Sequence, residues 1–479
     1  MALLGIDLGT SGVKVLILDT RGSTLSVSKA SYEVRSPQPG RAESDPDAWW
    51  RATITAVRAA TAQIPQVEIT AIGFSGQMHG VVPTDEEGRP TRAALLWADT
   101  RAEEELQCYL DLPPALLEQL ANPLVPGMAG PLLCWVADHE PSVYKATCWA
   151  LQPKDWLRCR LTDSFATDPS DASATLLYNL PADRWADEVI DALGLKRELF
   201  APVLASGESA GMLSGQAARE LGLSPGLPVA TGAADTAAAA LGAGLLAPGP
   251  IQLTLGTGAQ VVQLIAKPQA DPTRRTHLYR AADGANWYRM AAVQNAGLVL
   301  DWVRRALNAT WEELYESANR VPPGSAGLMF LPYLTRERPH HPNPGGAGAF
   351  LGMRIDHRRE HLLHAALEGV AFGIRAALDA LPGASNESTL RLAGGGSIHP
   401  AWRQMLADIL GRELWAVDTP DASARGAALL AGIANGIWDN AAATASIAPP
   451  VHLVAIPRGR KAVYEEVYAK FKRLPASGT

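Results

Sequence analysis

The 479-residue chain is poor in cysteine, with four residues and no Cys-x-x-Cys pair among them. Cys108, Cys134, Cys148 and Cys159 are separated by 26, 14 and 11 residues. This spacing is typical neither of a disulfide framework nor of a zinc site. We therefore expect four buried, reduced thiols.

The chain also lacks an excess of basic residues, since 42 Lys and Arg stand against 49 Asp and Glu. Proteins that wrap nucleic acid carry a basic stripe, so we expect no nucleic-acid partner. The longest uncharged stretch, 236–266, is interrupted by glycines and two prolines, which argues against a membrane span. Residues 1–7 lack the basic region of a signal peptide, so we expect a cytoplasmic protein without a membrane partner.

The sequence Gly-x-x-x-x-Gly-Lys-Ser/Thr is absent, which excludes an ordinary P-loop. Two similar segments are present instead, 6–15 and 253–262, each a strand, a Gly-Thr turn and a second strand. Their offset of 247 residues is about half the chain. It indicates two related α/β domains whose turns face a shared cleft, although chance similarity of two glycine-containing hairpins is the alternative.

Proline and glycine at 248–250 mark the expected boundary between the two domains. We predict an N-terminal domain over 1–246 and a C-terminal domain over 247–440. An extension over 441–479 should end in a helix at 461–474, with Val463, Val467, Tyr468 and Phe471 on its apolar face.

The N-terminal region reads as strands followed by helices, the order typical of an α/β core. Asp45 can cap a helix that begins at Pro46, because both residues suit a helix start. The expected strands here are 3–8, 13–19, 23–28 and 69–75.

A Gly-Thr turn after a strand presents backbone N–H groups, which suit phosphate oxygens. Two such turns facing each other could clamp a polyphosphate from both sides. Asp7 in the first hairpin has Thr254 as its counterpart in the second. A role that needs charge therefore belongs only to the N-terminal side.

Asp235 follows a predicted strand and begins a helix of small residues at 237–241. Its structural alternative is a simple N-cap. Small apolar neighbours near a domain boundary allow a close approach of substrate, and a carboxylate there can accept a proton from a hydroxyl group.

Two further loops follow strands. Gln77, Met78 and His79 lie between two glycines, at a strand end where α/β sheets bind ligands, with a purely structural role as the equal alternative. The glycines at 394–396 precede an amphipathic helix at 401–410. They either admit a flat ring or a phosphate, or only permit a sharp turn.

Three other patterns are set aside. The dinucleotide-like sequence at 242–247 ends a helix instead of following a strand. His361 and His364 lack a third metal ligand nearby. Residues 207–211 match a hydrolase nucleophile elbow, but only a short strand at 202–205 is expected before them, and no helix directly behind Ser209.

Together these segments resemble the FGGY carbohydrate kinases and, within them, the xylulokinases. The resemblance runs from Gly5 to about Gly432 and implies an α/β fold of two actin-like, ribonuclease H-like domains with a cleft between them, closing over ATP and a sugar. The matching stretches, in chain order, are 5–14, 76–80, 96–101, 153–157, 166–172, 232–235, 331–334, 368–370 and 393–396.

The resemblance also implies that the domain over 1–246 binds the sugar and that the domain over 247–440 binds the nucleotide, and it implies roles for single residues. Asp235 corresponds to the general base, and Asp7 with Asp235 to the carboxylates near Mg²⁺. Besides Asp235, the sugar site would contain Gln77, Met78, His79, Trp97 and Thr236. The ATP site would contain Gly9, Thr10, Ser11, Lys14, Gly256, Thr257, Gly394, Gly395 and Ser397.

Two positions depart from the family pattern, which often has Asn at both: Ala98 follows Trp97, and Thr236 follows Asp235. We expect phosphorylation of a ketopentose, with D-xylulose first. Ribulose, glycerol or gluconate are alternative substrates, and a non-catalytic sensor or a chaperone-like ATPase is the alternative class. Retention of Asp7 and Asp235 argues against a sensor. The expected partners are the sugar and ATP, and the sequence is compatible with a homodimer.

Overall fold

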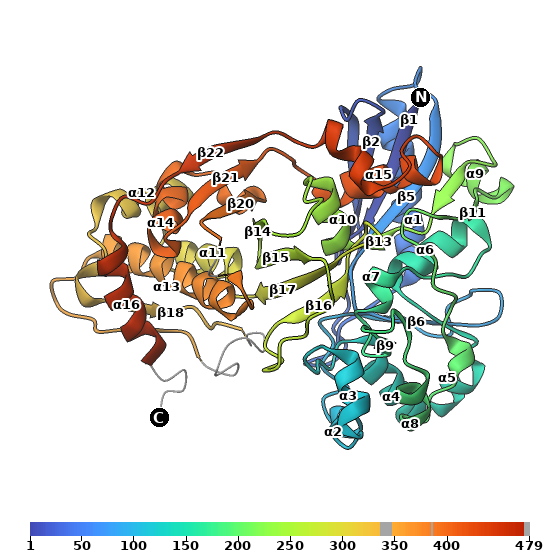
Figure 1. Ribbon diagram of the computed structural model, residues 1–479, viewed down its shortest axis with the longest axis horizontal. Helices are drawn as coiled ribbons and strands as arrows, with labels where there is room; N and C mark the ends of the chain where they lie inside the picture. Colours follow the sequence, from blue (N-terminus) through green and yellow to red (C-terminus); the bar gives the residue numbers. More distant parts are fainter. Residues whose placement is uncertain (336–346, 385–386, 474–479) are drawn as a thin grey trace.

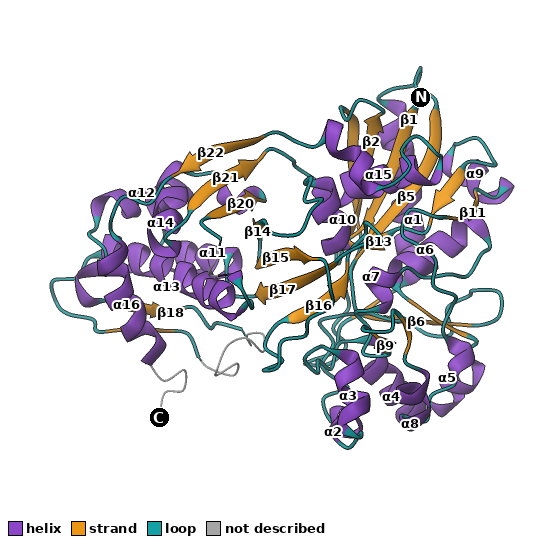
Figure 2. Ribbon diagram, in the orientation of Figure 1, coloured by secondary structure: helices purple, strands orange, loops and turns teal. Residues whose placement is uncertain are grey.

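The computed structural model describes residues 1–335, 347–384 and 387–473 (Figure 1). Two large mixed sheets dominate it, each built around an antiparallel hairpin with parallel strands beside it (Figure 2). The first sheet has the order β11-β12-β5-β1-β2-β3, with β13 paired to β5. Its strands are β1 (Ala2–Leu8), β2 (Gly12–Asp19), β3 (Thr24–Ser31), β5 (Ile69–Gly76), β11 (Ser209–Met212), β12 (Pro228–Ala230) and β13 (Ala233–Ala234).

The second sheet has the order β22-β21-β20-β14-β15-β17-β16. Its strands are β14 (Ile251–Leu255), β15 (Ala259–Ile265), β16 (His277–Arg280), β17 (Trp287–Val293), β20 (Thr389–Ala393), β21 (Glu413–Val417) and β22 (Val451–Ala455).

The two sheets repeat one topology. In the first, β1 pairs antiparallel with β2 and parallel with β5. In the second, β14 pairs antiparallel with β15 and parallel with β20. Within the hairpins Asp7 lies opposite Lys14, whereas Thr254 lies opposite the uncharged Gln260. The duplicated α/β fold predicted from the two hairpins is confirmed, and so is the charge asymmetry between them.

Helices cover both faces of the first sheet. Helix α1 (Pro46–Ala62), capped by Asp45 as predicted, packs on β2 and β3 on one face. On the other face, α15 (Ala422–Ala434) packs against β1 and β5, and α10 (Asp235–Gly242) packs against α15 and β5. Ala237 and Leu241 of α10 share a core cluster with Val262 and Met290 of the second sheet. Helix α10 therefore lies between the two domains.

Helix α15 approaches the first sheet so closely that two positions require glycine. A Cβ atom on Gly5 would lie 2.0 Å from the Ala424 carbonyl oxygen, and one on Gly73 would lie 2.0 Å from that of Ala427. Figure 1 shows α15, near the red end of the scale, beside the blue strands. The division of the chain at residues 246 and 440 stays a prediction. Two elements pack outside their predicted domains: α15 packs on the first sheet, and β22, from the predicted extension, completes the second sheet.

The remaining elements surround these two cores. On the first domain lie α2 (Leu106–Leu110), α3 (Pro114–Leu120), α4 (Ala129–His139), α5 (Pro141–Ala146), α6 (Pro153–Thr162), α7 (Pro169–Ala172), α8 (Asp187–Ala192) and α9 (Gly215–Leu221). On the second lie α11 (Gly297–Ala306), α12 (Trp311–Arg320), α13 (Arg359–Ala380), α14 (Pro400–Leu410) and α16 (Lys461–Arg473). Short strands complete the chain: β4 (Glu43–Ser44), β6 (Val82–Thr84), β7 (Ala94–Leu95), β8 (Trp149–Leu151), β9 (Tyr178–Asn179), β10 (Arg184–Trp185), β18 (Met329–Leu331) and β19 (Ala349–Leu351).

Three details differ from the sequence predictions. Cys108 and Cys148 are exposed, while Cys134 and Cys159 are buried as expected. Residues 202–205 form no strand, because only a single bridge joins Val203 to Thr167 there. Helix α16 buries Tyr464, Tyr468 and Phe471, but the side chain of Val463 is exposed; residue 474, the predicted helix end, lies outside the described residues.

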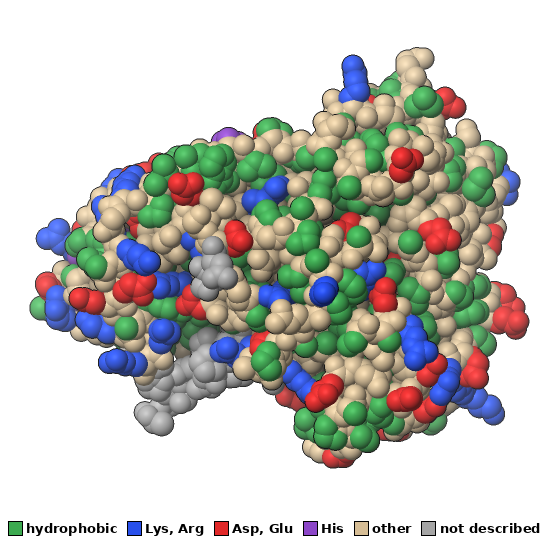
Figure 3. Space-filling model, viewed as in Figure 1, with side chains coloured by type: hydrophobic (Ala, Val, Ile, Leu, Met, Phe, Trp, Pro, Cys, Tyr) green, Lys and Arg blue, Asp and Glu red, His purple; other side chains and the backbone are tan. Residues whose placement is uncertain are grey.

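Ser209 lies inside β11, so the strand–turn–helix geometry of a nucleophile elbow is not formed there. Within the described residues no helix is both long and apolar enough to cross a membrane. On the face drawn in Figure 3, Lys and Arg side chains are interspersed with Asp and Glu.

Candidate active site

The site is organised around two aspartates held at the same edge of the first sheet. Asp7 lies near the end of β1, and Asp235 is the first residue of α10. Strand β13, directly before α10, runs parallel to β5, which itself runs parallel to β1. Parallel strands bring their carboxyl ends to one edge, and this places both carboxylates there.

Burial and nearby charges set the protonation of the two carboxyl groups. Burial raises the pKa of Asp7, while a hydrogen bond donated by the Ser75 hydroxyl, at 2.8 Å, and the charge of Lys14 lower it. Burial and the negative charge of Asp7 raise the pKa of Asp235 to about 7. The N–H of Thr236, 2.6 Å away, and its hydroxyl, 3.1 Å away, both donate to the Asp235 carboxylate and act in the opposite direction.

Asp235 is not the N-cap of α10, which was the structural alternative to a catalytic role. The N-cap residue is Ala234, which has no polar side chain to cap the helix. Among the described residues, the Asp235 carboxylate instead bonds within its own first turn, to Thr236. The Thr236 hydroxyl also lies 3.4 Å from the side-chain oxygen of Gln260, which links α10 to the second sheet.

Lys14 connects the first hairpin to the start of α15. Its ammonium lies 2.6 Å from the carboxylate of Asp421, the residue directly before that helix. Lys14 is also the strand partner of Asp7. The cation predicted for the ATP site is therefore placed beside Asp7.

A pocket of about 970 Å³ opens between the domains. Residues 97–100 and 124–127 line it from the first domain, and 256–260 and 292–294 from the second. The second Gly-Thr turn lines this space, and the first is connected to it through Trp97, whose indole N–H donates to the Thr10 hydroxyl at 2.9 Å. Its volume lies within the range typical of small-molecule sites.

The glycine loop predicted at 394–396 adjoins the second Gly-Thr turn. Gly394 has φ 90°, and a Cβ there would lie 2.2 Å from the Leu255 carbonyl oxygen, next to Gly256. A Cβ at Gly395 would meet no atom within 4 Å. The Ser397 hydroxyl donates to the Gly394 carbonyl at 2.7 Å and closes the turn. The loop thus requires one glycine for its own fold and leaves open space at the next.

The loop at 77–79 packs against the second domain. His79 has φ 75°, and its Nδ1 donates to the Ala174 carbonyl oxygen at 2.9 Å. Its ring centroid lies 5.9 Å from that of Tyr279 on β16. The Tyr288 hydroxyl donates to the Met78 sulfur at 3.8 Å, and the Gln77 amide donates to the Gly9 carbonyl at 3.4 Å. One loop therefore contacts both the first turn and the opposite sheet.

Two sets of residues in this region were not identified from the sequence as site residues. The first is Ser75, whose hydroxyl donates to Asp7; it lies in an apolar strand and gives no sequence signal. The second set is a buried charge cluster at α6 and α7: the Lys154 ammonium lies 2.6, 2.9 and 3.1 Å from the carboxylates of Asp155, Asp168 and Asp171. Its residues belong to the matched stretches 153–157 and 166–172, which was the available signal.

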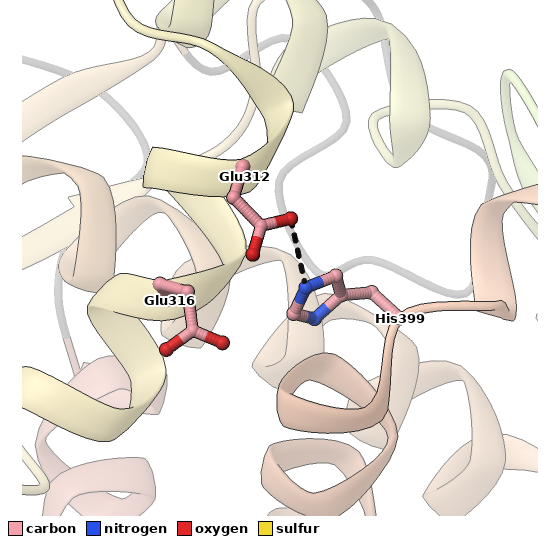
Figure 4. A group of neighbouring side chains, drawn as sticks. All are labelled: Glu312, Glu316 and His399. Carbon is pink, nitrogen blue, oxygen red and sulfur yellow. Dashed lines mark ion pairs between the residues drawn. The ribbon is translucent and has the colours of Figure 1, made fainter.

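A separate group at α12 and α14 has the ligand types of a metal site (Figure 4). His399 Nε2 lies 3.4 Å from a Glu312 carboxylate oxygen, with Glu316 beside them. However, His399 Nδ1 accepts the Ala401 N–H at 3.3 Å, so the ring proton of the neutral form is on Nε2. That nitrogen then donates to Glu312 and has no lone pair for a metal.

The two histidines set aside earlier have ordinary partners. His361 Nδ1 accepts the Arg358 N–H at 3.1 Å. His364 is buried, with its Nδ1 3.0 Å from the Ser325 hydroxyl.

Comparison with known proteins gives a match over both halves of the chain. Residues 2–242 match the model of the N-terminal domain of the FGGY family of carbohydrate kinases, and residues 251–435 match that of the C-terminal domain. The xylulose kinase of Escherichia coli (strain K12) is 33% identical over 434 residues, covering 90% of each chain. The gluconokinase of Bacillus subtilis (strain 168) is 29% identical over 459 residues, covering 91% of this chain and 88% of that one. The crystal structure of a xyloylose kinase from Brucella ovis matches with a TM-score of 0.91 at 33% identity, over 98% of each chain.

Proposed function

The chain belongs to the FGGY family of carbohydrate kinases, and from that premise we propose that it phosphorylates D-xylulose at its C5 hydroxyl, using ATP. The observation that carries the proposal is the Asp235 carboxyl group, whose pKa is raised to about 7 by burial and by Asp7. A general base works best when its pKa lies near the working pH. The relative named xylulose kinase supports the choice of a ketopentose.

In the proposed reaction, the sugar oxygen forms a bond to the γ-phosphorus of ATP while the bond between that phosphorus and the β,γ-bridging oxygen breaks. The hydroxyl proton passes to the Asp235 carboxylate, and ADP leaves. The transition state of such transfers is largely metaphosphate-like, so positioning and electrostatics supply most of the rate.

The donor set fits Mg²⁺, because two neighbouring carboxylates with raised pKa values offer hard oxygen ligands and repel each other without a cation. Asp7 and Asp235 would hold the ion, which when bound neutralises charge on the phosphate oxygens. The N–H groups of Gly9 and Gly256 close their own turns, so the backbone donors that the chain would offer to those oxygens are at 10–11 and 257.

Residues of the first domain would orient the sugar. His79 is buried, its Nδ1 donates to the Ala174 carbonyl oxygen, and its ring would contact a sugar hydroxyl. Trp97, Gln77 and Met78 lie around the same end of the sheet, and Thr236 borders the base. Closure of the two domains over this space would exclude water and limit ATP hydrolysis.

The second candidate is a kinase of the same family acting on another substrate, gluconate above all. It is supported by the 29% identity with a gluconokinase. It is also supported by two positions where the family pattern often has Asn: Ala98, which lines the pocket, and Thr236. An ADP-release assay with D-xylulose, ribulose, glycerol and gluconate decides between them. We expect the highest kcat/KM with D-xylulose; a higher value with gluconate would replace the first candidate, and no ADP release with any of them would indicate a sensor.

A further inference from the structure

The backbone just before Asp235 is held by a serine from another part of the chain. The Ala234 N–H donates to the Ser170 hydroxyl oxygen at 2.9 Å. Ser170 lies in α7 and is fully buried. Its hydroxyl in turn donates to an oxygen of Asp168 at 2.6 Å, and its own N–H donates to the same oxygen at 3.0 Å.

The charge cluster fixes the orientation of that serine. One oxygen of Asp168, Oδ2, accepts both Ser170 bonds and a third from the Ser206 hydroxyl at 2.8 Å. The other, Oδ1, lies 2.9 Å from the Lys154 ammonium. Since the Ser170 hydroxyl proton is directed at Asp168, its lone pair is left for the Ala234 N–H.

We propose that Ser170, oriented by Asp168, is a positioning residue that fixes the first turn of α10 and with it the carboxylate of Asp235. This rests on the proposed function, in which Asp235 is the base. Ala234 cannot anchor the turn through a side chain, and β13 before it is only two residues long. The Ser170 bond therefore supplements a short strand pairing at the point where the reactive group begins.

The chain offers a matched control. Ser206 is also buried and donates to the same Asp168 oxygen, but within the part of the chain that the structure describes its hydroxyl makes no hydrogen bond to the α10 segment; its backbone carbonyl accepts the N–H of Gly232. Ser170→Ala and Ser206→Ala each remove one hydroxyl bond from one carboxylate. Only the first removes the bond to Ala234.

We expect Ser170→Ala to lower kcat roughly 10- to 100-fold, the scale of a misplaced catalytic group. The KM values for sugar and ATP should change less than twofold. Ser206→Ala should keep kcat within about threefold of wild type, although both variants lower the melting temperature. Equal losses of kcat in the two variants, or a loss in KM alone, would overturn the proposal.

A second measurement does not depend on turnover. Hydrogen exchange of the peptide 230–238, followed by mass spectrometry, should be faster in Ser170→Ala than in wild type and unchanged in Ser206→Ala. If Ser170→Ala exchanges faster but the wild-type protein phosphorylates none of the tested substrates, the result would count against the proposed function and not against the positioning role. Unchanged exchange in Ser170→Ala would count against the positioning role, whatever the enzyme phosphorylates.

Discussion

Asp7 raises the pKa of Asp235. The two residues lie on neighbouring segments at one edge of the first sheet, and the charge of Asp7 adds to burial in bringing the pKa of Asp235 to about 7. The direction of this pKa shift matters for catalysis, because a base must be ionised to accept a proton. The proportion of active enzyme should therefore depend on pH in the neutral range.

The first prediction concerns that pH dependence. In the metal-free protein we expect Asp235, followed by NMR, to titrate with a midpoint near 7; kcat/KM for the sugar at saturating Mg²⁺ should rise with pH and level off at or below that midpoint, because a bound cation favours the ionised carboxylate. Asp7→Asn should lower the pKa of Asp235 in the metal-free protein, because it removes the charge that raises this pKa. A pKa that is the same in both metal-free proteins would show that the two carboxylates are not coupled.

The second prediction tests the base directly. Asp235→Asn should lower kcat by about 10²- to 10⁴-fold, the usual cost of losing a general base. Binding of ATP and sugar should change little, because the amide keeps the shape of the carboxyl group. Asp191→Asn, at an exposed aspartate paired with Arg197, is the control. Near-normal turnover of the Asp235 variant would refute its assignment.

The third prediction uses the asymmetry of the two hairpins. Asp7→Ala should raise the Mg²⁺ concentration needed for half-maximal rate and lower kcat. Thr254→Ala, at the matching position of the second hairpin, should have a mild effect because no charge is lost. Similar Mg²⁺ titrations for the two variants would mean that the asymmetry has no catalytic role.

The fourth prediction concerns the sugar loop. His79 has a positive φ, which asparagine tolerates better than alanine, so His79→Asn removes the imidazole with less backbone strain. Loss of a partner for a buried sugar hydroxyl costs about 1–3 kcal/mol, or roughly a 5- to 150-fold rise in the sugar KM. The KM for ATP should stay near the wild-type value. A parallel rise in both KM values would assign the loop a structural role.

The fifth prediction contrasts a buried with an exposed ion pair. Lys154→Met should lower the free energy of unfolding by about 3–5 kcal/mol, because the buried Asp168 and Asp171 lose their cation while Asp155 keeps only Arg158. Arg197→Met breaks an exposed pair with Asp191 and should leave the urea midpoint nearly unchanged. Equal midpoints for the two variants would contradict this account of the cluster.

Much of the fold could be predicted because its signals are local. The two Gly-Thr hairpins, the cap at Asp45 and the start of α10 at Asp235 each depend on residues adjacent in the chain. The repeated hairpin also predicted the duplication, because strand pairing on either side of it follows the same rule in both sheets.

The rest of the site could not be predicted because it depends on contacts between distant segments. Ser75 bonds Asp7 across 68 residues, and Ser170 bonds Ala234 across 64. A single serine in an apolar strand has no periodic or spacing signal. The packing of α15 on the first sheet could not be predicted from local sequence either, because an apolar helix of this kind could be buried in either domain.

That return has a consequence for how the protein is made. Synthesis proceeds from the N-terminus, so β1 and β5 leave the ribosome long before the helix that packs over Gly5 and Gly73. Until α15 emerges, the sheet face bearing Leu3, Leu16 and Ala71 lacks that cover. Exposed apolar faces of partly made chains favour aggregation and chaperone binding. The first domain begun on the ribosome is therefore among the last parts to be finished.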